Sequence, residues 1–247
     1  MDKYGLIGYP LGHSFSKSYF NDKFKAEKID AEYLNFEIPS IDDFPYIIRT
    51  NPELKGLNVT IPYKEVIKNY LDDISPEARA IGAINVIRID HSKKEPLLIG
   101  YNSDIIGFVN SIEPLLKSHH KKALILGTGG ASKAIKYGLE KKLGLQTVNV
   151  SRTIKDRCIT YDDITADVLK EYEVIVNCTP VGTFPNIDEC PNIPYEHLTG
   201  NNLLYDLVYN PDETLFIKLG AKYGASVKNG LEMLLLQANA AWDFWNK

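Results

Sequence analysis

A glycine-rich turn between a short apolar run and a helical pattern constrains this chain more than any other feature. Residues 123–126 are Ala-Leu-Ile-Leu, and the segment Gly127-Thr-Gly-Gly-Ala-Ser132 follows them directly. Glycines let a backbone approach a pyrophosphate closely, and the free N–H groups at the start of the following helix hold its charge. The pattern therefore predicts a strand–turn–helix unit that binds the phosphates of a dinucleotide.

A second predicted strand, residues 147–150, is followed by Ser151 and Arg152. An acidic residue at this point holds the ribose 2′-hydroxyl of NAD, whereas an arginine can pair with the extra 2′-phosphate of NADP. Arg152 therefore favours NADP. Two alternatives stay open: a glycine turn that only joins a strand to a helix, and an arginine that is only solvated. Ser132 replaces the third glycine or alanine of the fingerprint, but its small side chain still allows close helix packing.

Composition and charge exclude several classes of function. The chain has 247 residues, 44% of them hydrophobic, a formal net charge of −4 and a pI near 5.8. This balance argues against a surface that coats nucleic acid, and the basic cluster at 117–122 is typical of a solvated loop. No apolar stretch has the length of a membrane span, and residues 1–10 lack the apolar core of a leader peptide. We expect a cytoplasmic protein, monomer or homodimer, with a small-molecule partner.

The cysteines and histidines indicate neither disulfides nor a metal site. Three cysteines, Cys158, Cys178 and Cys190, form no C-x-x-C pair, which fits a reducing compartment. The neighbouring His119 and His120 have no further ligand at metal-binding spacing.

Alternating strand and helix patterns predict an α/β fold with two open sheets. No Pro/Ser-rich linker marks a junction, which we place at 101–107. The last helix has apolar residues at helical spacing, predicted to pack in the core: Leu231, Leu234, Leu235, Ala238 and Trp242. Strands are expected at 4–8, 31–37, 56–60, 83–89, 96–100, 122–126, 147–150, 174–177 and 203–207, and helices from 17, near 41, at 105–116 and at 230–242.

Polar residues at predicted strand ends are candidates for chemistry, because open α/β sheets gather functional groups there. In Asn58-Val-Thr-Ile-Pro-Tyr-Lys64, Thr60 ends a strand and Lys64 is expected to open a helix, whose dipole would favour the neutral amine. Asn85 interrupts an apolar strand and needs buried partners or a ligand. Asp104 has a competing role as the N-cap of a helix beginning at Ile105. Ser16 has the same alternative at its own helix.

Eight collinear motifs closely resemble the shikimate dehydrogenase family over essentially the whole chain. Any one of them is a weak signal, but their order along the chain is that of the family. They are Gly8-Tyr-Pro-Leu-Gly-His13-Ser14-Phe-Ser16, Asn58-Val-Thr-Ile-Pro-Tyr-Lys64, Gly82-Ala-Ile-Asn85, Gly100-Tyr-Asn-Ser-Asp104, Gly127-Thr-Gly-Gly-Ala131, Asn177-Cys-Thr-Pro-Val-Gly182, Tyr209-Asn-Pro and Gly230-Leu-Glu-Met-Leu-Leu-Leu-Gln237.

The resemblance implies an NADP-dependent oxidoreductase that reduces 3-dehydroshikimate to shikimate in chorismate and aromatic amino-acid biosynthesis. It also implies a substrate-binding domain over 1–103, completed by the C-terminal helix 231–247, and a Rossmann-type NADP-binding domain over 104–230. The active site would lie in the cleft between them.

The resemblance further implies individual residue roles. Lys64 would be the acid/base residue, paired with Asp104. Ser14 and Ser16 would hold the substrate carboxylate with Tyr209 nearby, and Thr60, Asn85, Asp104 and Gln237 would bind the ring oxygens. NADP would contact Gly127, Thr128, Gly129, Gly130 and Ala131 with its pyrophosphate, Ser151, Arg152 and Thr153 with its adenosine ribose and phosphate, and Thr179, Leu207 and Gly230 with its nicotinamide.

Two departures from the family pattern stand out. Leu207 replaces a frequent methionine of similar volume, and Asp156 lies close to where another basic residue often supports the 2′-phosphate.

Two rival functions stay open: a quinate/shikimate dehydrogenase that uses NAD, and a ligand-sensing module without catalysis. The serine pair with Arg152 argues against the first, and the retained pair of Lys64 and Asp104 argues against the second.

Overall fold

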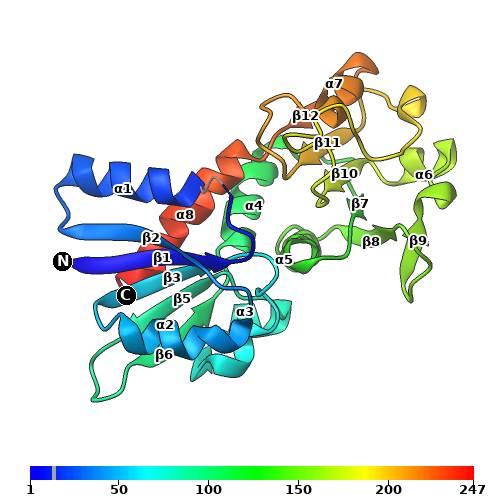
Figure 1. The fold of residues 1–247 in the computed structure, drawn as a ribbon. Helices are drawn as coiled ribbons and strands as arrows, with labels where there is room; N and C mark the ends of the chain where they lie inside the picture. Colours follow the sequence, from blue (N-terminus) through cyan, green and yellow to red (C-terminus); the bar gives the residue numbers. More distant parts are fainter. Residues whose placement is uncertain (13–14) are drawn as a thin grey trace. The chain divides into compact units, whose positions relative to one another are not determined.

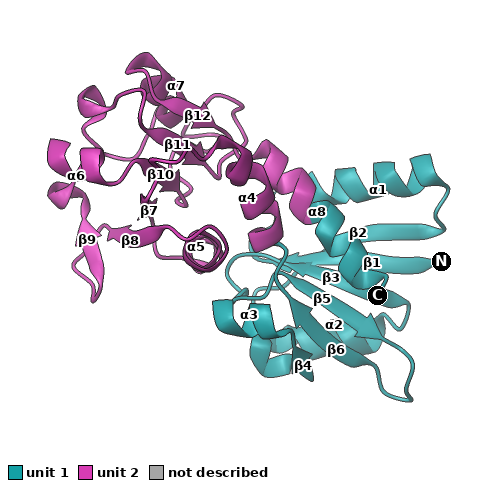
Figure 2. Cartoon of the chain, turned by 180° about the vertical axis from the view of Figure 1, so that it is seen from behind, with its two compact units in different colours: residues 1–103, 238–247 teal, residues 104–237 magenta. Residues whose placement is uncertain are grey.

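The computed structural model describes residues 1–12 and 15–247 as two compact α/β units (Figure 2). Unit 1 contains Met1–Ser103 and Ala238–Lys247, and unit 2 contains Asp104–Gln237. The last helix, α8 (Leu231–Trp245), begins in unit 2 and ends in unit 1. Each unit is built around one six-stranded sheet (Figure 1), as the alternating sequence patterns predict.

The unit 1 sheet has the strand order β2-β1-β3-β5-β6-β4. Its helices are α1, α2 and α3, with the 3₁₀ turns η1 and η2 beside them. The strands are β1 (Asp2–Gly8), β2 (Ala31–Glu37), β3 (Leu54–Val59), β4 (Asp73–Ile74), β5 (Val86–Asp90) and β6 (Leu97–Tyr101); the helical segments are α1 (Phe15–Glu27), η1 (Ile41–Asp43), α2 (Phe44–Thr50), η2 (Ile67–Tyr70) and α3 (Pro76–Ile81).

One strand of unit 1 runs against the predicted direction. β1 pairs in parallel with β2 and β3, as crossover helices require, but β5 is antiparallel to both β3 and β6. The reason is the short connection at 91–96, which has room for a hairpin and not for a crossover helix. β5 also begins at Val86, later than the predicted strand at 83–89; residues 83–85 form an irregular link between the left-handed Gly82, which ends α3, and the strand.

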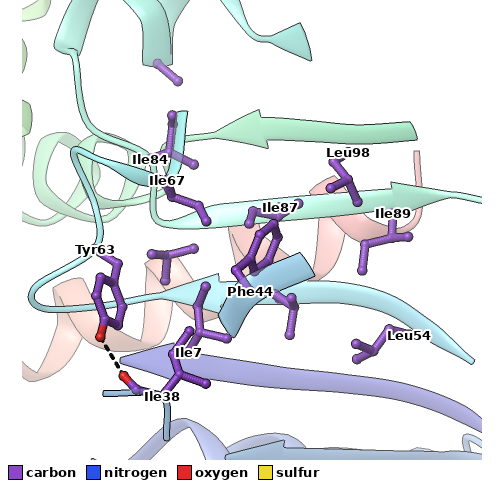
Figure 3. Packing of buried hydrophobic residues seen from close by; sticks show 13 residues of the cluster. Ile7, Ile38, Phe44, Leu54, Tyr63, Ile67, Ile84, Ile87, Ile89 and Leu98 are labelled. Atoms are coloured by element: carbon purple, nitrogen blue, oxygen red, sulfur yellow. Dashed lines mark hydrogen bonds between the residues drawn. The ribbon is translucent and has the colours of Figure 1, made fainter. Parts of the chain in front are cut away.

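Alternating side chains divide the unit 1 core between the two faces of its sheet. Ile7 and Ile87 join Phe44 and Ile67 in one cluster, beneath α2 and η2 (Figure 3). On the opposite face Tyr4, Val86 and Tyr33 pack against α1 and the final part of α8 through Phe20, Phe24, Ala241 and Trp245.

The unit 2 sheet has the strand order β12-β11-β10-β7-β8-β9, and every neighbouring pair is parallel. The order reverses between β7 and β10, and ligands of open α/β sheets bind at the carboxyl ends of the strands at such a point. The strands are β7 (Lys122–Leu126), β8 (Gln146–Ser151), β9 (Cys158–Thr160), β10 (Val174–Asn177), β11 (Leu203–Asp206) and β12 (Ser226–Lys228). The helices are α4 (Asp104–Ile112), α5 (Gly130–Tyr137), α6 (Ala166–Glu171) and α7 (Leu215–Lys222), with short turns η3 (Glu113–Leu115), η4 (Gly138–Lys142), η5 (Tyr161–Asp163) and η6 (Tyr195–His197).

Both faces of this sheet are covered, so its central strands are apolar on both sides. Leu124 and Ile175 pack with α6 and α7, through a cluster that includes Leu169 and Phe216. Ile125 and its neighbours on the other face pack with α4 and α5 through Phe108 and Ile135.

The predicted apolar stripe of α8 is confirmed in its C-terminal half and wrong in its first turns. Ala238 is buried and Trp242 is partly buried, and both pack in the cluster that holds Ala241 and Trp245. Leu231 and Leu235 are 39% and 37% exposed, and Met233 is the buried residue of that part of the helix. Within the described ranges, no helix combines the length and apolarity needed to cross a membrane.

Close packing of β3 on α8 gives the first testable prediction. A Cβ at Gly56 would lie 2.2 Å from Cδ1 of Trp245, a buried ring. We expect Gly56→Ala to lower the free energy of unfolding by about 1–3 kcal/mol, as overpacked cores do, measured by chemical denaturation. Gly12→Ala is the control, because a Cβ there meets no heavy atom of the described residues within 4 Å. Equal stability of the two variants would contradict this packing.

Candidate active site

One edge of the unit 1 sheet collects polar residues from three segments. Thr60 directly follows β3, Asn102 follows β6, and Asn85 directly precedes the reversed strand β5. Val59 N–H donates to the Asn85 carbonyl at 2.9 Å, and Asn85 N–H donates to the Tyr101 carbonyl at 3.1 Å. The antiparallel strand thus brings its first residues to the edge where its neighbours end.

Lys64 lies in the turn between β3 and η2, close to this edge. Its carbonyl accepts the Ile84 N–H at 2.7 Å, and the hydroxyl of the buried Tyr63 donates to the Ile38 carbonyl at 2.5 Å (Figure 3). These two hydrogen bonds fix the backbone of the turn that carries the half-buried Lys64 side chain. The prediction that Lys64 opens a helix is wrong, because the first helical residue after β3 is Ile67, in a single 3₁₀ turn. The helix-dipole argument therefore does not apply at this position.

Asn85 finds the buried partners that its sequence position requires. Its Nδ2 donates to Ser103 Oγ at 3.0 Å, and its Oδ1 accepts the Ser103 N–H at 2.7 Å. The pair fixes the chain just before Asp104, which is buried. Asp104 is the first residue of α4. The alternative N-cap role of Asp104 is therefore wrong by one position, because the helix begins one residue earlier than Ile105.

The Ser16 side chain is part of a series of hydrogen-bonded side chains. Ser16 is the second residue of α1, so the alternative that it only caps this helix is wrong. Its hydroxyl is hydrogen-bonded to the phenol of the fully buried Tyr33, which donates to Asn58 Oδ1 at 2.7 Å. Asn58 Nδ2 donates in turn to the Asn85 carbonyl at 3.3 Å. Burial raises the pKa of Tyr33 well above its usual value, so the phenol stays protonated.

The glycine turn of unit 2 lies at the switch point of its sheet. Gly127 has φ +113°, and a Cβ there would lie 3.2 Å from Thr179 Cγ2. No heavy atom of the described residues lies within 4 Å of a Cβ built at Gly129, the N-cap of α5. The buried Ser132 donates to the Gly129 carbonyl at 2.7 Å, which steadies the turn. An open backbone before a helix N-terminus fits a pyrophosphate.

The end of β8 presents cations beside this turn. Ser151 is buried, and its hydroxyl accepts the Thr153 N–H at 3.3 Å. Arg152 is exposed. Lys155 Nζ donates to Thr128 Oγ1 at 3.1 Å, which brings a second cation to the glycine turn. These groups fit the phosphate of an adenosine ribose.

A buried network joins the ends of β10 and β11. Asn177 Nδ2 donates to Asp206 Oδ1 at 2.9 Å, and Thr214 Oγ1 donates to Asp206 Oδ2 at 2.6 Å. The Asn177 Oδ1 atom accepts the Thr179 N–H at 3.0 Å. Burial raises the pKa of Asp206 to about 6, although its three hydrogen bonds act in the opposite direction.

The remaining candidates for contact with the nicotinamide are hydrogen-bonded to residues at or after the ends of β10 and β11. Leu207 N–H donates to the Asn177 carbonyl at 3.0 Å, and Gly230 N–H donates to the Val208 carbonyl at 3.1 Å. A Cβ at Gly230 would lie 2.2 Å from the Leu207 carbonyl oxygen, so only glycine fits. Tyr209 is half-buried, and burial raises its pKa.

The predicted residues that the structure describes are divided between the two units. Ser14 lies outside the described residues. Gln237 packs on α4, where its backbone nitrogen would be 3.1 Å from a Cβ at Gly107, three residues after Asp104. Unit 1 carries Ser16, Thr60, Lys64 and Asn85; unit 2 carries Asp104, Tyr209, Gln237 and the cofactor candidates Gly127, Thr128, Gly129, Gly130, Ala131, Ser151, Arg152, Thr153, Thr179, Leu207 and Gly230.

Four supporting residues are absent from the sequence-based set: Tyr33, Asn58, Ser103 and Asp206. Asp206 had a usable signal, because a carboxylate at the end of the apolar run 203–205 needs partners when buried. Tyr33 had none, since an aromatic residue in a strand is ordinarily core.

The raised pKa of Asp206 predicts a pH-dependent stability difference. The ionised form is disfavoured in the fold, so this carboxyl costs stability as pH rises from its unfolded value of 3.8 through about 6. Asp206→Asn removes that dependence. We expect the stability of the variant relative to wild type to increase by about 2 kcal/mol between about pH 4 and about pH 7, measured by denaturant unfolding. A difference independent of pH would contradict the shift.

Comparison with known proteins shows the family to which the chain belongs. Residues 6–87 match the family model "Shikimate dehydrogenase substrate binding domain". The chain is 37% identical to the shikimate dehydrogenase (NADP(+)) of Methanococcus maripaludis, over 98% of this chain and 90% of that protein. Two crystal structures are similar: a shikimate dehydrogenase with NADP+ (33% identity, TM-score 0.85, 99% and 89% of the chains), and the Thermus thermophilus enzyme with NADP(H) and shikimate (28%, 0.85, 99% and 93%). The chain belongs to the shikimate dehydrogenase family of NADP-dependent oxidoreductases.

Proposed function

We propose that this chain catalyses the reversible NADPH-dependent reduction of 3-dehydroshikimate to shikimate, a step of aromatic amino-acid biosynthesis. The observation that carries the proposal is the full-length match to enzymes of this name, 37% identical over 98% of the chain. The lysine and the aspartate that the chemistry needs, Lys64 and Asp104, are both present.

NADP would supply the hydride donor or acceptor when bound. The open backbone at Gly129 and the left-handed Gly127 support pyrophosphate binding before α5. Arg152 would pair with the 2′-phosphate, with Lys155 as a second cation in place of a basic residue at Asp156. Thr179, Leu207 and Gly230 would hold the nicotinamide side.

Shikimate would bind through its carboxylate and its ring oxygens. Ser14 and Ser16 would donate hydrogen bonds to the carboxylate, with Tyr209 nearby. Thr60, Asn85, Asp104 and Gln237 would bind the ring hydroxyls. The Tyr33 phenol supports this assignment, because it contacts the Ser16 hydroxyl and bonds Asn58, which in turn holds the backbone carbonyl of Asn85.

Lys64 would transfer the proton. Reduction of the ketone leaves negative charge on its oxygen, and an ammonium group within hydrogen-bond reach neutralises that charge as it forms. In the oxidation the neutral amine accepts the proton from the alcohol. Asp104 would orient the amine and stabilise its charged form.

A spectrophotometric assay of NADPH formation tests the function directly. We expect turnover of shikimate with NADP+ and much slower turnover of quinate or with NAD+, because Arg152 favours the 2′-phosphate. Preferential turnover of quinate with NAD+ would replace the proposal by the quinate/shikimate alternative. Binding of shikimate without any turnover would favour a sensing module.

Replacing the proposed proton donor tests the mechanism. We expect Lys64→Met to lower kcat by about 10³-fold or more while shikimate Kd stays within about tenfold, because the interaction is used mainly in the transition state. Kd is measured calorimetrically and kcat in the assay above. An unchanged kcat would remove Lys64 from the mechanism.

Replacing Tyr33, whose phenol is hydrogen-bonded to Ser16, is predicted to have a smaller effect. Tyr33→Phe removes one hydroxyl that bonds both Ser16 and Asn58. We expect the KM for shikimate to rise about three- to tenfold, the equivalent of one hydrogen bond, with the KM for NADP+ unchanged. Tyr195→Phe is the control, because that buried hydroxyl donates to the Pro191 carbonyl in unit 2. A KM unchanged in Tyr33→Phe would contradict the supporting role.

A further inference from the structure

The buried network around Asn177 leaves its side-chain amide only one orientation. Its Nδ2 donates to Asp206 Oδ1 at 2.9 Å and to the Val181 carbonyl at 3.5 Å. Its Oδ1 accepts from Thr179 N at 3.0 Å and from Thr179 Oγ1 at 2.6 Å. A carboxylate and a carbonyl only accept hydrogen bonds, so the NH₂ group must face them and the amide oxygen must face Thr179.

This orientation determines the hydrogen-bonding role of Thr179. Its single hydroxyl hydrogen points to Asn177 Oδ1, and one lone pair accepts the Val181 N–H at 3.3 Å. The half-buried hydroxyl therefore has one acceptor position left and no donor to offer. Thr179 lies beside Gly127, at the switch point where the dinucleotide is expected.

Asp206 is the origin of this polarity. Asp206, Asn177 and Thr214 are fully buried. The carboxylate accepts from Asn177 Nδ2 and, at 3.0 Å, from Val208 N–H with Oδ1, and from Thr214 Oγ1 with Oδ2. Removing its oxygens would leave three buried donors without an acceptor and would free the Asn177 amide to turn.

We propose that Asp206 is a positioning residue that, through the Asn177 amide, makes Thr179 Oγ1 an acceptor for the carboxamide N–H of the nicotinamide ring. The proposal rests on the NADP-dependent function above and deepens it. Asp206 and Asn177 also fix the segment that follows β11. The Asp206 carboxylate accepts the Val208 N–H, and the Asn177 carbonyl accepts the Leu207 N–H.

Calorimetric binding of three compounds tests it. NADP+ carries the carboxamide; 3-acetylpyridine adenine dinucleotide phosphate has a methyl ketone that cannot donate; 2′-phosphoadenosine diphosphoribose lacks the ring altogether. We expect wild type to bind NADP+ about three- to tenfold more tightly than the acetylpyridine analogue, the equivalent of one hydrogen bond. This ratio of dissociation constants is the readout.

The ratio should fall close to one in Asp206→Ala and stay at the wild-type value in Asp206→Asn. The asparagine Oδ1 can still accept from Asn177 and Val208, and its NH₂ can donate to Thr214 Oγ1. Binding of the ring-less compound should be the same in all variants. A wild-type ratio in folded Asp206→Ala would overturn the proposal.

A milder variant decides the matter if Asp206→Ala does not fold. Thr214→Val removes the hydroxyl that holds Oδ2 and also the N-cap of α7, so Thr165→Val, which removes the N-cap of α6, is the matched control. The ratio should drop at least twofold in Thr214→Val only. Equal ratios in both variants would contradict the proposal. Failure of wild type to bind NADP+ and the ring-less compound would instead refute the proposed function.

Discussion

Buried amide groups at the strand ends are the constraint on which both groups of candidate residues depend. Asn85 stands before β5 and Asn177 ends β10, and both are buried. A buried amide without partners costs on the order of 1–3 kcal/mol for each lost bond. Each asparagine therefore holds the neighbouring loop in the one conformation that satisfies it: Ser103 before Asp104 in the first case, Thr179 in the second.

The reversed strand β5 gives unit 1 its polar edge. In an all-parallel sheet Asn85 would lie at the edge opposite to Thr60, because the first and last residues of parallel strands occupy opposite ends. The hairpin between β5 and β6 turns the strand, so that its first residue meets the ends of β3 and β6. In unit 2 the strands are all parallel, and the polar groups lie at the strand ends where the strand order reverses between β7 and β10.

Much of the architecture is predictable because short apolar runs and glycine turns depend on local sequence. The strands at 31–37, 122–126 and 174–177 lie where their patterns predict. The direction of β5 also has a local signal, because the connection at 91–96 is too short for a crossover helix. The helical start after Lys64 is not a local property, since it follows from a turn held by Tyr63 and Ile84. The supporting residue Tyr33 escapes prediction for the same reason, since its partner Asn58 is distant in the sequence. The position of Asp206 signals a need for partners, but the sequence does not identify Asn177 as one of them.

The most direct test of the account is a crystal structure of the chain with shikimate and NADP+ bound together. The account predicts Nζ of Lys64 about 3 Å from the hydroxyl oxygen whose carbon loses hydride. A complex in which another protonatable side chain contacts that oxygen, with the Lys64 amine directed into solvent, would contradict it.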